Sequence, residues 1–264
     1  MDGFASLQKC IERLVRIKCS NYKEDYIKRR ILSRMRLTNT EDYEAYQKYL
    51  LTHPEEIDLL RKALTINVTK FFRDPDVFEV IQQKILPDLA RHKKLIRIWC
   101  AGCATGEEPY SIAILAHELM ALHRDLNVTI YATDIDTEAL QKAMAGIYDL
   151  KALENVDKHR IRRHFISRDD GTFEVCPHLR ELVKFRQHDL MSGVPVARYL
   201  DIVVCRNVTI YFTEKQENEL TYLFHTALST DGYYVMGKTE YLGREVEHLF
   251  TPYSAVQKIL RKAT

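Results

Sequence analysis

From residue 95 onwards, short apolar runs rich in β-forming residues alternate with helical stretches, and this alternation constrains the fold more than any other feature. The expected strands are 95–101, 128–133, 182–187, 201–205 and 233–237, and the expected helices are 110–122, 137–145 and 214–228. Strands that alternate with helices are typical of a parallel sheet covered by helices on both faces. The sequence therefore predicts an α/β fold with a doubly wound sheet.

Residues 1–66 are expected to form a separate helical domain. Apolar residues such as Leu7 and Ile11 recur there at helical spacing, which predicts four short helices in a small bundle. Residues 67–94 are expected to be a linker and one helix that ends at Pro87.

A small antiparallel β insertion is expected at about residues 164–183. Short alternating strands there flank the turn at residues 168–171, and Asp170-Gly171 is a good hairpin signal. The insertion interrupts the sheet domain, which is expected to span residues 95–264.

Composition narrows the possible partners. With 39 basic and 37 acidic residues, the net charge of +2 is too balanced for general affinity to nucleic acid or anionic lipid. No apolar run approaches the ~20 residues that cross a bilayer, and Met1–Ser6 lacks the basic and apolar regions of a secretory signal. Six cysteines are too few for a disulfide scaffold in a chain of this length. We therefore expect a cytoplasmic protein with reduced thiols and no membrane insertion.

A turn with two glycines, AGCATGEEPYS at residues 101–111, follows the first expected strand. In doubly wound folds a nucleotide-like ligand lies against this turn, and Gly102 removes a Cβ that would block its approach. The three-glycine pattern of a dinucleotide site is incomplete, a P-loop motif is absent, and Glu107 and Glu108 would repel a phosphate. A positively charged, phosphate-free adenosine cofactor fits better, and S-adenosylmethionine has these properties.

Asp134 lies at the tip of the second strand, where an acidic side chain can accept hydrogen bonds from both ribose hydroxyls. Purely structural alternatives stay open for the acidic residues. Glu108 could complete a capping box with Thr105, and Asp136 could cap the helix that follows it.

Two further groups of polar residues are candidates for the same edge of the sheet. The strand at 201–205 delivers Arg206, Asn207 and Tyr211 to the carboxyl edge, where ligands bind in open α/β sheets. Methyltransferases that act on amino nitrogens often carry Asn-Pro-Pro-aromatic here, whereas this chain continues Val-Thr after Asn207, which disfavours an amine or nucleobase acceptor.

Upstream of the sheet, Asn67, Thr69 and Arg73 surround an aromatic pair. They are either functional or part of a helix junction in which Arg73 pairs with Asp74 or Asp76.

In this order, the motifs NxTxFFR, AGCATGEEPYS, ATDID and CRNVxIYF resemble those of CheR-type chemotaxis receptor methyltransferases, over essentially the whole chain. The resemblance implies a Rossmann-like class I methyltransferase sheet and S-adenosylmethionine as the cofactor, with S-adenosylhomocysteine as product. Such enzymes methylate glutamate side chains of methyl-accepting chemotaxis receptors. The resemblance implies that the cofactor is bound by Asn67, Thr69, Arg73, Glu108, Asp134, Asp189, Leu190, Arg206 and Asn207. Gly102, the glycine of the turn, is expected to contact the cofactor as well.

Two positions depart from the family's pattern. Asp189-Leu190 replaces the usual Asn-Leu, so the backbone is expected to serve the adenine edge. Some members bind a receptor C-terminal peptide through a glycine-flanked loop of the insertion. Here residues 167–172 contain one glycine, so we expect no peptide tether.

Methyl transfer to a carboxylate needs no general base, because the nucleophile is already ionised at neutral pH. The enzyme must align the reacting atoms and exclude water, and a guanidinium is suited to fixing a carboxylate. We predict that Arg73 orients the substrate glutamate and that Tyr211 lines the methyl-transfer pocket.

The basic stretch at residues 23–36 is expected to dock on the acidic face of the receptor's cytoplasmic helical region. The residues predicted to make this contact are Lys28, Arg29, Arg30, Arg34 and Arg36. The alternative is a solvated helix face. The protein is expected to be a monomer.

Other chemistries have less support. Cys100 and Cys103 have the spacing of a redox site, but nearby acidic residues would raise a thiol pKa. Cys176 and His178 are the only pair considered for zinc, and no metal is expected. The alternative functions are a methyltransferase for another protein or small carboxylic acid, and a non-catalytic cofactor-binding sensor.

Overall fold

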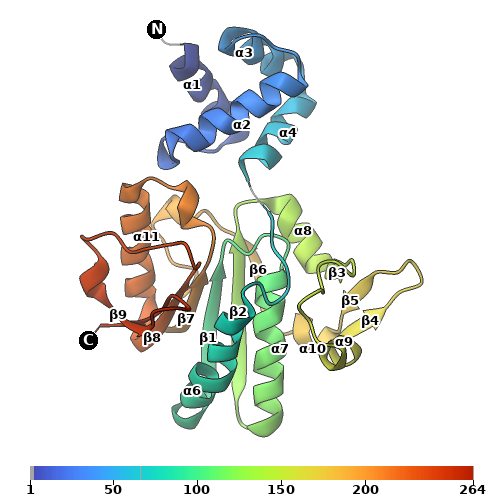
Figure 1. Ribbon diagram of the computed structural model, residues 1–264, viewed down its shortest axis with the longest axis vertical. Helices are drawn as coiled ribbons and strands as arrows, with labels where there is room; N and C mark the ends of the chain where they lie inside the picture. Colours follow the sequence, from blue (N-terminus) through green and yellow to red (C-terminus); the bar gives the residue numbers. More distant parts are fainter. Residues whose placement is uncertain (1–2, 66, 264) are drawn as a thin grey trace. The chain divides into compact units, whose positions relative to one another are not determined.

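The computed structural model describes residues 3–65 and 67–263. Residues 1–2, 66 and 264, where limits of the expected domains fall, lie outside the described residues. The chain divides into two compact units, and each is described by itself (Figure 1). The smaller unit comprises residues 1–66 and 211–216, and the larger unit comprises 67–210 and 217–264.

The smaller unit contains four helices between residues 3 and 65, as predicted. They are α1 (Gly3–Val15), α2 (Glu24–Leu37), α3 (Tyr43–Thr52) and α4 (Pro54–Leu64). Asp42 caps α3 through a bond from the Ala45 amide to its carboxylate, and Pro54 fits the first turn of α4, where its missing N–H costs nothing. The apolar faces bury a shared core that includes Leu7, Ile11, Ile27, Ile31, Tyr46, Leu50 and Leu60.

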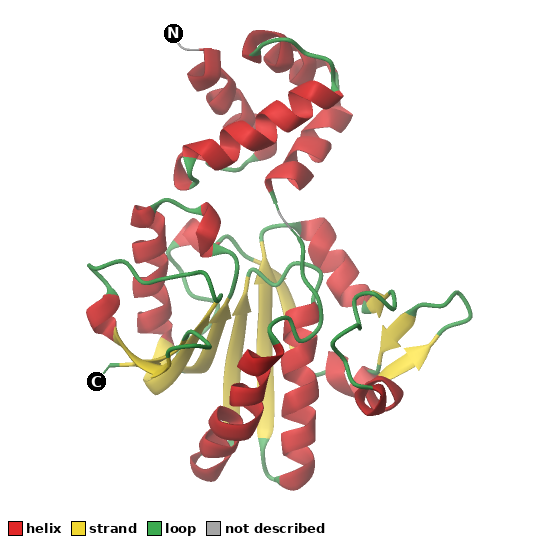
Figure 2. Ribbon diagram, in the orientation of Figure 1, coloured by secondary structure: helices red, strands yellow, loops and turns green. Residues whose placement is uncertain are grey.

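The larger unit is built on a seven-stranded sheet of order β6-β2-β1-β7-β8-β10-β9 (Figure 2). The strands are β1 (Leu95–Ala101), β2 (Asn127–Asp134), β6 (Val183–Gln187), β7 (Leu200–Cys205), β8 (Leu228–Met236), β9 (Phe250–Ser254) and β10 (Ile259–Lys262). The first five in this order are parallel, which confirms the predicted sheet. The antiparallel β10 and β9 were not predicted, because Pro252 in β9 weakens the strand signal; a proline is tolerated there because β9 is the edge strand.

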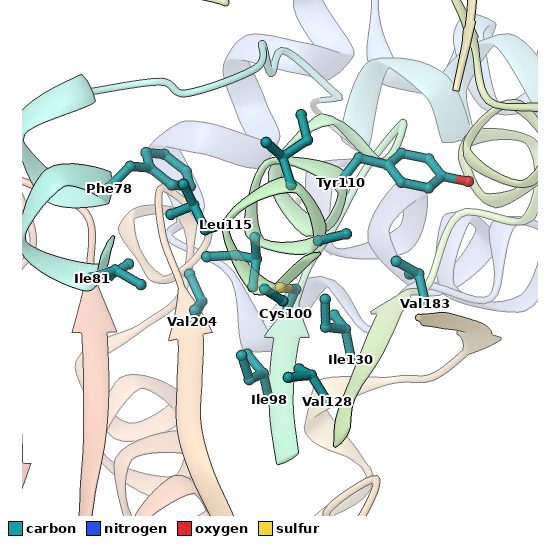
Figure 3. Packing of buried hydrophobic residues seen from close by; sticks show 14 of the residues in the cluster. Phe78, Ile81, Ile98, Cys100, Tyr110, Leu115, Val128, Ile130, Val183 and Val204 are labelled. Carbon is teal, nitrogen blue, oxygen red and sulfur yellow. The ribbon is translucent and has the colours of Figure 1, made fainter. Parts of the chain in front are cut away.

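Helices cover both faces of the sheet, as predicted. On one face, Ile98, Ile130 and Val204 from three strands pack against Leu115 of α7 (Figure 3). On the other face, the ring of Trp99 in β1 lies 5.3 Å from that of Phe224 in α11. The helices are α5 (Pro75–Val80), α6 (Leu86–His92), α7 (Glu107–Leu122), α8 (Thr137–Ala145) and α11 (Glu214–Ala227).

The helix before the sheet does not end at Pro87, so that prediction was wrong. A π-helical turn at Ile81–Ile85 joins α5 to α6, and the Leu86 amide donates to the Ile81 carbonyl. This wider turn places Pro87 in the first turn of α6, where proline is tolerated.

The strands expected within 164–183 are present as β4 (Phe165–Ser167) and β5 (Phe173–Val175), which pair antiparallel. With β3 (Ile147–Tyr148) they form a three-stranded sheet of order β3-β5-β4. The short helices α9 (Lys158–His164) and α10 (Pro177–Arg180), which the sequence did not reveal, flank the strands. Among residues 3–65 and 67–263, no helix is both long and apolar enough to span a bilayer.

Candidate active site

The turn after β1 folds against the end of β2. The amides of Gly102 and Cys103 both donate to the Thr133 carbonyl, at 2.8 and 2.9 Å. The Ala104 amide donates to the Asp134 carboxylate at 2.8 Å. The two predicted parts of the cofactor site are therefore joined by hydrogen bonds.

Gly102 is required by the protein's own packing. Its φ of +76° lies in the left-handed region, and a Cβ there would lie 2.6 Å from a methyl carbon of Val208. The sequence reading assigned this glycine to the approach of a ligand. The structure adds a tighter constraint, because the turn after β1 and the loop after β7 touch at this point.

Glu108 does not form the capping box considered above. Thr105 instead donates to the neighbouring Glu107, at 2.7 Å. The Glu108 carboxylate accepts a bond of 3.2 Å from the buried guanidinium of Arg206. Burial raises the pKa of Glu108, and the charge of Arg206 opposes this rise.

Arg206 also fixes the segment that carries Arg73. One of its nitrogens donates to the Arg73 carbonyl, at 3.0 Å, and to the Asp74 carboxylate. Phe72 and Asp74 have φ angles of 49° and 59°, which non-glycine residues rarely adopt. Such backbone strain around a single residue is common at functional sites.

The guanidinium of Arg73 is not paired with either neighbouring aspartate, so the helix-junction alternative is wrong for this residue. Asp74 pairs with Arg206, and Asp76 pairs with Lys238 at 2.7 Å. Arg73 donates to the Val68 carbonyl, at 3.2 Å. It lines a cavity of about 590 Å³ together with Thr69, Asp74, Asn155 and Lys238. This volume lies within the range of pockets that hold small ligands.

At the tip of β2, Asp136 has the structural role considered as an alternative. Its carboxylate accepts bonds from the Glu138 and Ala139 amides and so caps α8. The same carboxylate accepts a 2.7 Å bond from the Asn67 side chain. This bond brings Asn67 to the edge where Asp134 lies.

The remaining predicted cofactor residues follow β6 and β7. The His188 amide donates to the Asp134 carbonyl, which holds the Asp189-Leu190 segment near the tip of β2. The Asp189 side chain accepts a bond from the Met191 amide, so its carboxylate serves its own turn. Asn207 has a left-handed φ of 61°.

Sequence reasoning missed Glu240, which supports the Asn207 loop. Its buried carboxylate accepts bonds from the amides of Val208, Thr209 and Gly237. A single acidic residue beyond the last parallel strand gives no local signal of this role. Only the tertiary fold shows that its oxygens point at three backbone donors.

Two models of protein families match the chain, and together they cover most of its length. The CheR methyltransferase SAM-binding domain, where SAM is S-adenosylmethionine, matches residues 67–259, and the CheR methyltransferase all-alpha domain matches residues 2–65. The chain belongs to the CheR methyltransferase family. It is therefore an S-adenosylmethionine-dependent methyltransferase of the chemotaxis system with a class I methyltransferase sheet.

Three curated CheR-type relatives cover most of the chain. Chemotaxis protein methyltransferase 2 of Vibrio cholerae is 33% identical, over 85% of this chain and 80% of its own length. The chemotaxis protein methyltransferase of Borreliella burgdorferi is 33% identical, over 90% and 88%. Chemotaxis protein methyltransferase 2 of Pseudomonas aeruginosa is 35% identical, over 90% and 86%.

The hydrogen-bond acceptors at the edge of the sheet fit the cofactor of the CheR family. Asp134 uses one carboxylate oxygen for Ala104 and the other for the Asp136 amide, and each oxygen keeps a second lone pair for a hydroxyl. Glu108 is paired with Arg206, so Asp134 is the carboxylate that remains at this edge for the cofactor. Burial raises the pKa of the Asp134 carboxyl.

Tyr211, which we predicted to line the methyl-transfer pocket, groups with the smaller unit. Its ring lies 4.8 Å from that of Tyr26, and its carbonyl accepts a bond from the Lys23 amide. The role of Tyr211 in the pocket stays a prediction.

The five basic residues proposed for receptor contact differ in their surroundings. Arg34 makes two hydrogen bonds, of 2.9 and 2.6 Å, to the buried carboxylate of Glu56, which also accepts a bond from Tyr46. Arg34 is therefore a half-buried residue held by the helical unit's own Glu56. The others have these positions: Lys28 pairs with Glu24, Arg30 lies over the ring of Tyr26, and Arg29 and Arg36 are exposed.

The thiols at the turn are unsuited to redox chemistry. Cys100 and Cys103 are free and buried. Burial, followed by nearby carboxylates, raises the pKa of each thiol well above its usual range. The reactive thiolate is thus disfavoured at both positions.

Proposed function

We propose that this protein transfers the methyl group of S-adenosylmethionine to glutamate side chains of methyl-accepting chemotaxis receptors. The supporting observation is the guanidinium of Arg73, which lines a cavity and forms no ion pair with Asp74 or Asp76, because these two aspartates bind Arg206 and Lys238. A fixed guanidinium is the usual partner of a carboxylate. The names of the relatives, chemotaxis protein methyltransferases, supply the biological setting.

Methyl transfer to a carboxylate requires no general base from the protein, because the carboxylate is already ionised. S-adenosylmethionine supplies an electrophilic methyl group on a positively charged sulfur. A carboxylate oxygen of the substrate would form the new bond to this carbon as the carbon–sulfur bond breaks with its electron pair on sulfur, which would give a methyl ester and S-adenosylhomocysteine. Arg73 would hold the carboxylate, and Glu108 and Asp134 would hold the cofactor, so catalysis rests on positioning.

Receptor docking is assigned to the exposed bases of α2. Within the part of the chain that the structure describes, Arg29 and Arg36 form no ion pair. Their charges are therefore available to an acidic helix of the receptor. Arg34 is left out of this surface because Glu56 occupies it. Complementary charge would speed the encounter with the cytoplasmic helical region of a receptor, particularly at low salt.

The test is incubation of the full chain with methyl-labelled cofactor and a receptor cytoplasmic fragment. We expect label on the receptor that mild base releases as methanol, and no label on a fragment whose candidate glutamates are replaced by alanine. Base-stable label would overturn the ester. Base-labile label on other proteins or on small acids, but not on the receptor, would establish the alternative carboxyl methyltransferase. Cofactor binding without transfer to any acceptor would leave a sensor.

A further inference from the structure

Three histidines from three helices of the larger unit meet beside the small sheet. They are His117 of α7, His164 at the end of α9 and His178 of α10, and one ring nitrogen from each lies within 4.8 Å of the other two. Nδ1 of His164 lies 3.0 Å from Nε2 of His178. The ring centroids of His117 and His178 lie 4.4 Å apart. None of these residues belongs to the proposed methyl-transfer machinery.

Hydrogen bonding among the rings leaves buried nitrogens unsatisfied. Nδ1 of His117 and Nε2 of His164 are buried without a hydrogen-bond partner. The whole His164 residue has no exposed surface. Nearly all buried polar atoms in folded proteins have a partner, so the orphan Nδ1 of His117 points to a bound ion or water, while Nε2 of His164 lies on the side of that ring away from His178.

The chemistry of the cluster suits a transition metal. The nitrogen of a neutral imidazole is the commonest metal ligand that a protein side chain offers. Two nitrogens bound to one tetrahedral zinc ion at ~2.0–2.1 Å lie roughly 3.3 Å apart, which is close to the separation of His164 and His178.

The carboxylate of Glu118 faces the ring nitrogen of His164 that would not bind the metal ion. Glu118 Oε1 lies 3.9 Å from Nε2 of His164, and Arg160 fixes that carboxylate with two bonds of 2.9 and 2.8 Å. A histidine that binds a metal through one nitrogen commonly donates its other N–H to a carboxylate in this way. The orphan nitrogen of His164 thus faces a suitable acceptor.

We propose that His117, His164 and His178 bind one divalent transition metal ion, with Zn²⁺ as the fitting ion. Imidazole ligands favour Zn²⁺ over Mg²⁺ or Ca²⁺, which prefer oxygen. A fourth position remains for water. The site is structural: it ties the short helices α9 and α10, which flank β4 and β5, to the 16-residue α7. It replaces the expectation that the chain holds no metal, and it uses His178 without Cys176.

The test uses the metal-stripped full chain, titrated with Zn²⁺ by calorimetry and with Co²⁺ by visible absorption. We expect one equivalent to bind, with an absorption typical of tetrahedral nitrogen coordination and a higher thermal midpoint. His117→Gln and His178→Gln should each weaken Zn²⁺ binding by at least about 10-fold, the lower range for loss of an outer-shell partner. Glu118→Gln is a milder variant that should weaken binding without removing a ligand.

Two controls mark the boundaries of the site. The first is His123→Gln, which changes a histidine just beyond the end of α7. The second is Cys176→Ser, which removes the free thiol close to His178. Both variants should keep the Zn²⁺ affinity of the parent. The proposal is overturned if the stripped protein takes up no Zn²⁺ in the calorimeter. It is equally overturned if folded His117→Gln and His178→Gln bind as tightly as the parent, or if only Cys176→Ser loses binding.

Discussion

Arg73 owes its position to residues that contact its backbone and not its side chain. Arg206 binds the Arg73 carbonyl, and the amide of Phe72 donates to the Ser111 hydroxyl at 2.9 Å. These bonds hold a strained backbone and leave the guanidinium available to a ligand. The motif NxTxFFR predicted that Arg73 matters, but the strain and the diversion of Asp74 depend on Ser111 and Arg206, which lie far outside the motif, and could not be predicted from it.

Replacing Arg73 should separate catalysis from cofactor binding. In Arg73→Ala, receptor methylation should fall by about 100-fold or more, the range seen when one preorganised donor is removed, while the affinity for S-adenosylhomocysteine changes little. Arg73→Lys, which keeps the charge without the planar fork, should recover only part of the rate. Rates with labelled cofactor and calorimetry measure the two quantities. Equal losses in both would restrict Arg73 to the cofactor.

Asp134 offers a test that includes pH. Asp134→Asn keeps the shape and one acceptor but removes the charge, so we expect roughly tenfold weaker cofactor binding. Because burial raises the pKa of Asp134, its carboxylate protonates at a higher pH than an ordinary one, and the parent should lose affinity as the pH falls. The variant should show a flatter pH profile by calorimetry. Unchanged affinity would remove the ribose role.

Glu240 is the residue whose importance only the structure reveals. Glu240→Ala would leave three buried amides without an acceptor, so the free energy of unfolding should drop by about 3 kcal/mol and cofactor binding should weaken as the Asn207 loop loosens. Urea unfolding and calorimetry measure both effects. The exposed Glu247→Ala is the matched control. A Glu240→Ala protein with unaltered stability would contradict this reading.

At the scale of elements, helix α2 combines a core face with a basic surface. Its buried side chains, Tyr26, Ile27, Ile31 and Met35, recur at helical spacing, so the sequence predicted the helix well. The same spacing could not show that Arg34 turns inward, because the burial of an arginine depends on a partner from another helix, here Glu56 of α4.

A charge reversal confined to the exposed part of α2 should impair docking. We expect the double variant Arg29→Glu and Arg36→Glu to raise the KM for the receptor, on the order of tenfold at low ionic strength and less at high salt, with cofactor affinity unchanged. The control reverses Arg91 and Lys94, two exposed bases of the larger unit. Equal effects in both double variants would show a general charge effect and discard the docking surface.

At the scale of the whole molecule, the strands and helices that form the parallel sheet were predictable because their periodicity is local. The elements that were missed have other causes. The π-helical turn that carries the chain past Pro87, the proline-containing β9 and the four-residue α10 all depend on tertiary contacts more than on local pattern. The motifs likewise predicted a cofactor edge, which stays a prediction, but they gave no sign of the histidine cluster, whose members come from three separate helices.

The division into two units should be visible in unfolding. Trp99, the single tryptophan, lies in the larger unit, so its fluorescence reports on that unit alone. Arg34→Ala leaves the buried Glu56 without its cation and should destabilise the helical unit by about 3 kcal/mol or more. We expect only the part of the helical circular dichroism signal that α1–α4 contribute to be lost at lower urea in this variant, with the rest of that signal and the Trp99 transition unmoved, because the larger unit has helices of its own. Coincident shifts of both signals would indicate one cooperative unit.

The contact between Gly102 and Val208 also bears on how such a chain can evolve. Any side chain at position 102 would collide with Val208, and the left-handed φ would strain it even if residue 208 were smaller. Position 208 can therefore shrink on its own, whereas position 102 is confined to glycine. A mutational library aimed at a bulkier sulfonium donor should thus vary position 208 and keep Gly102.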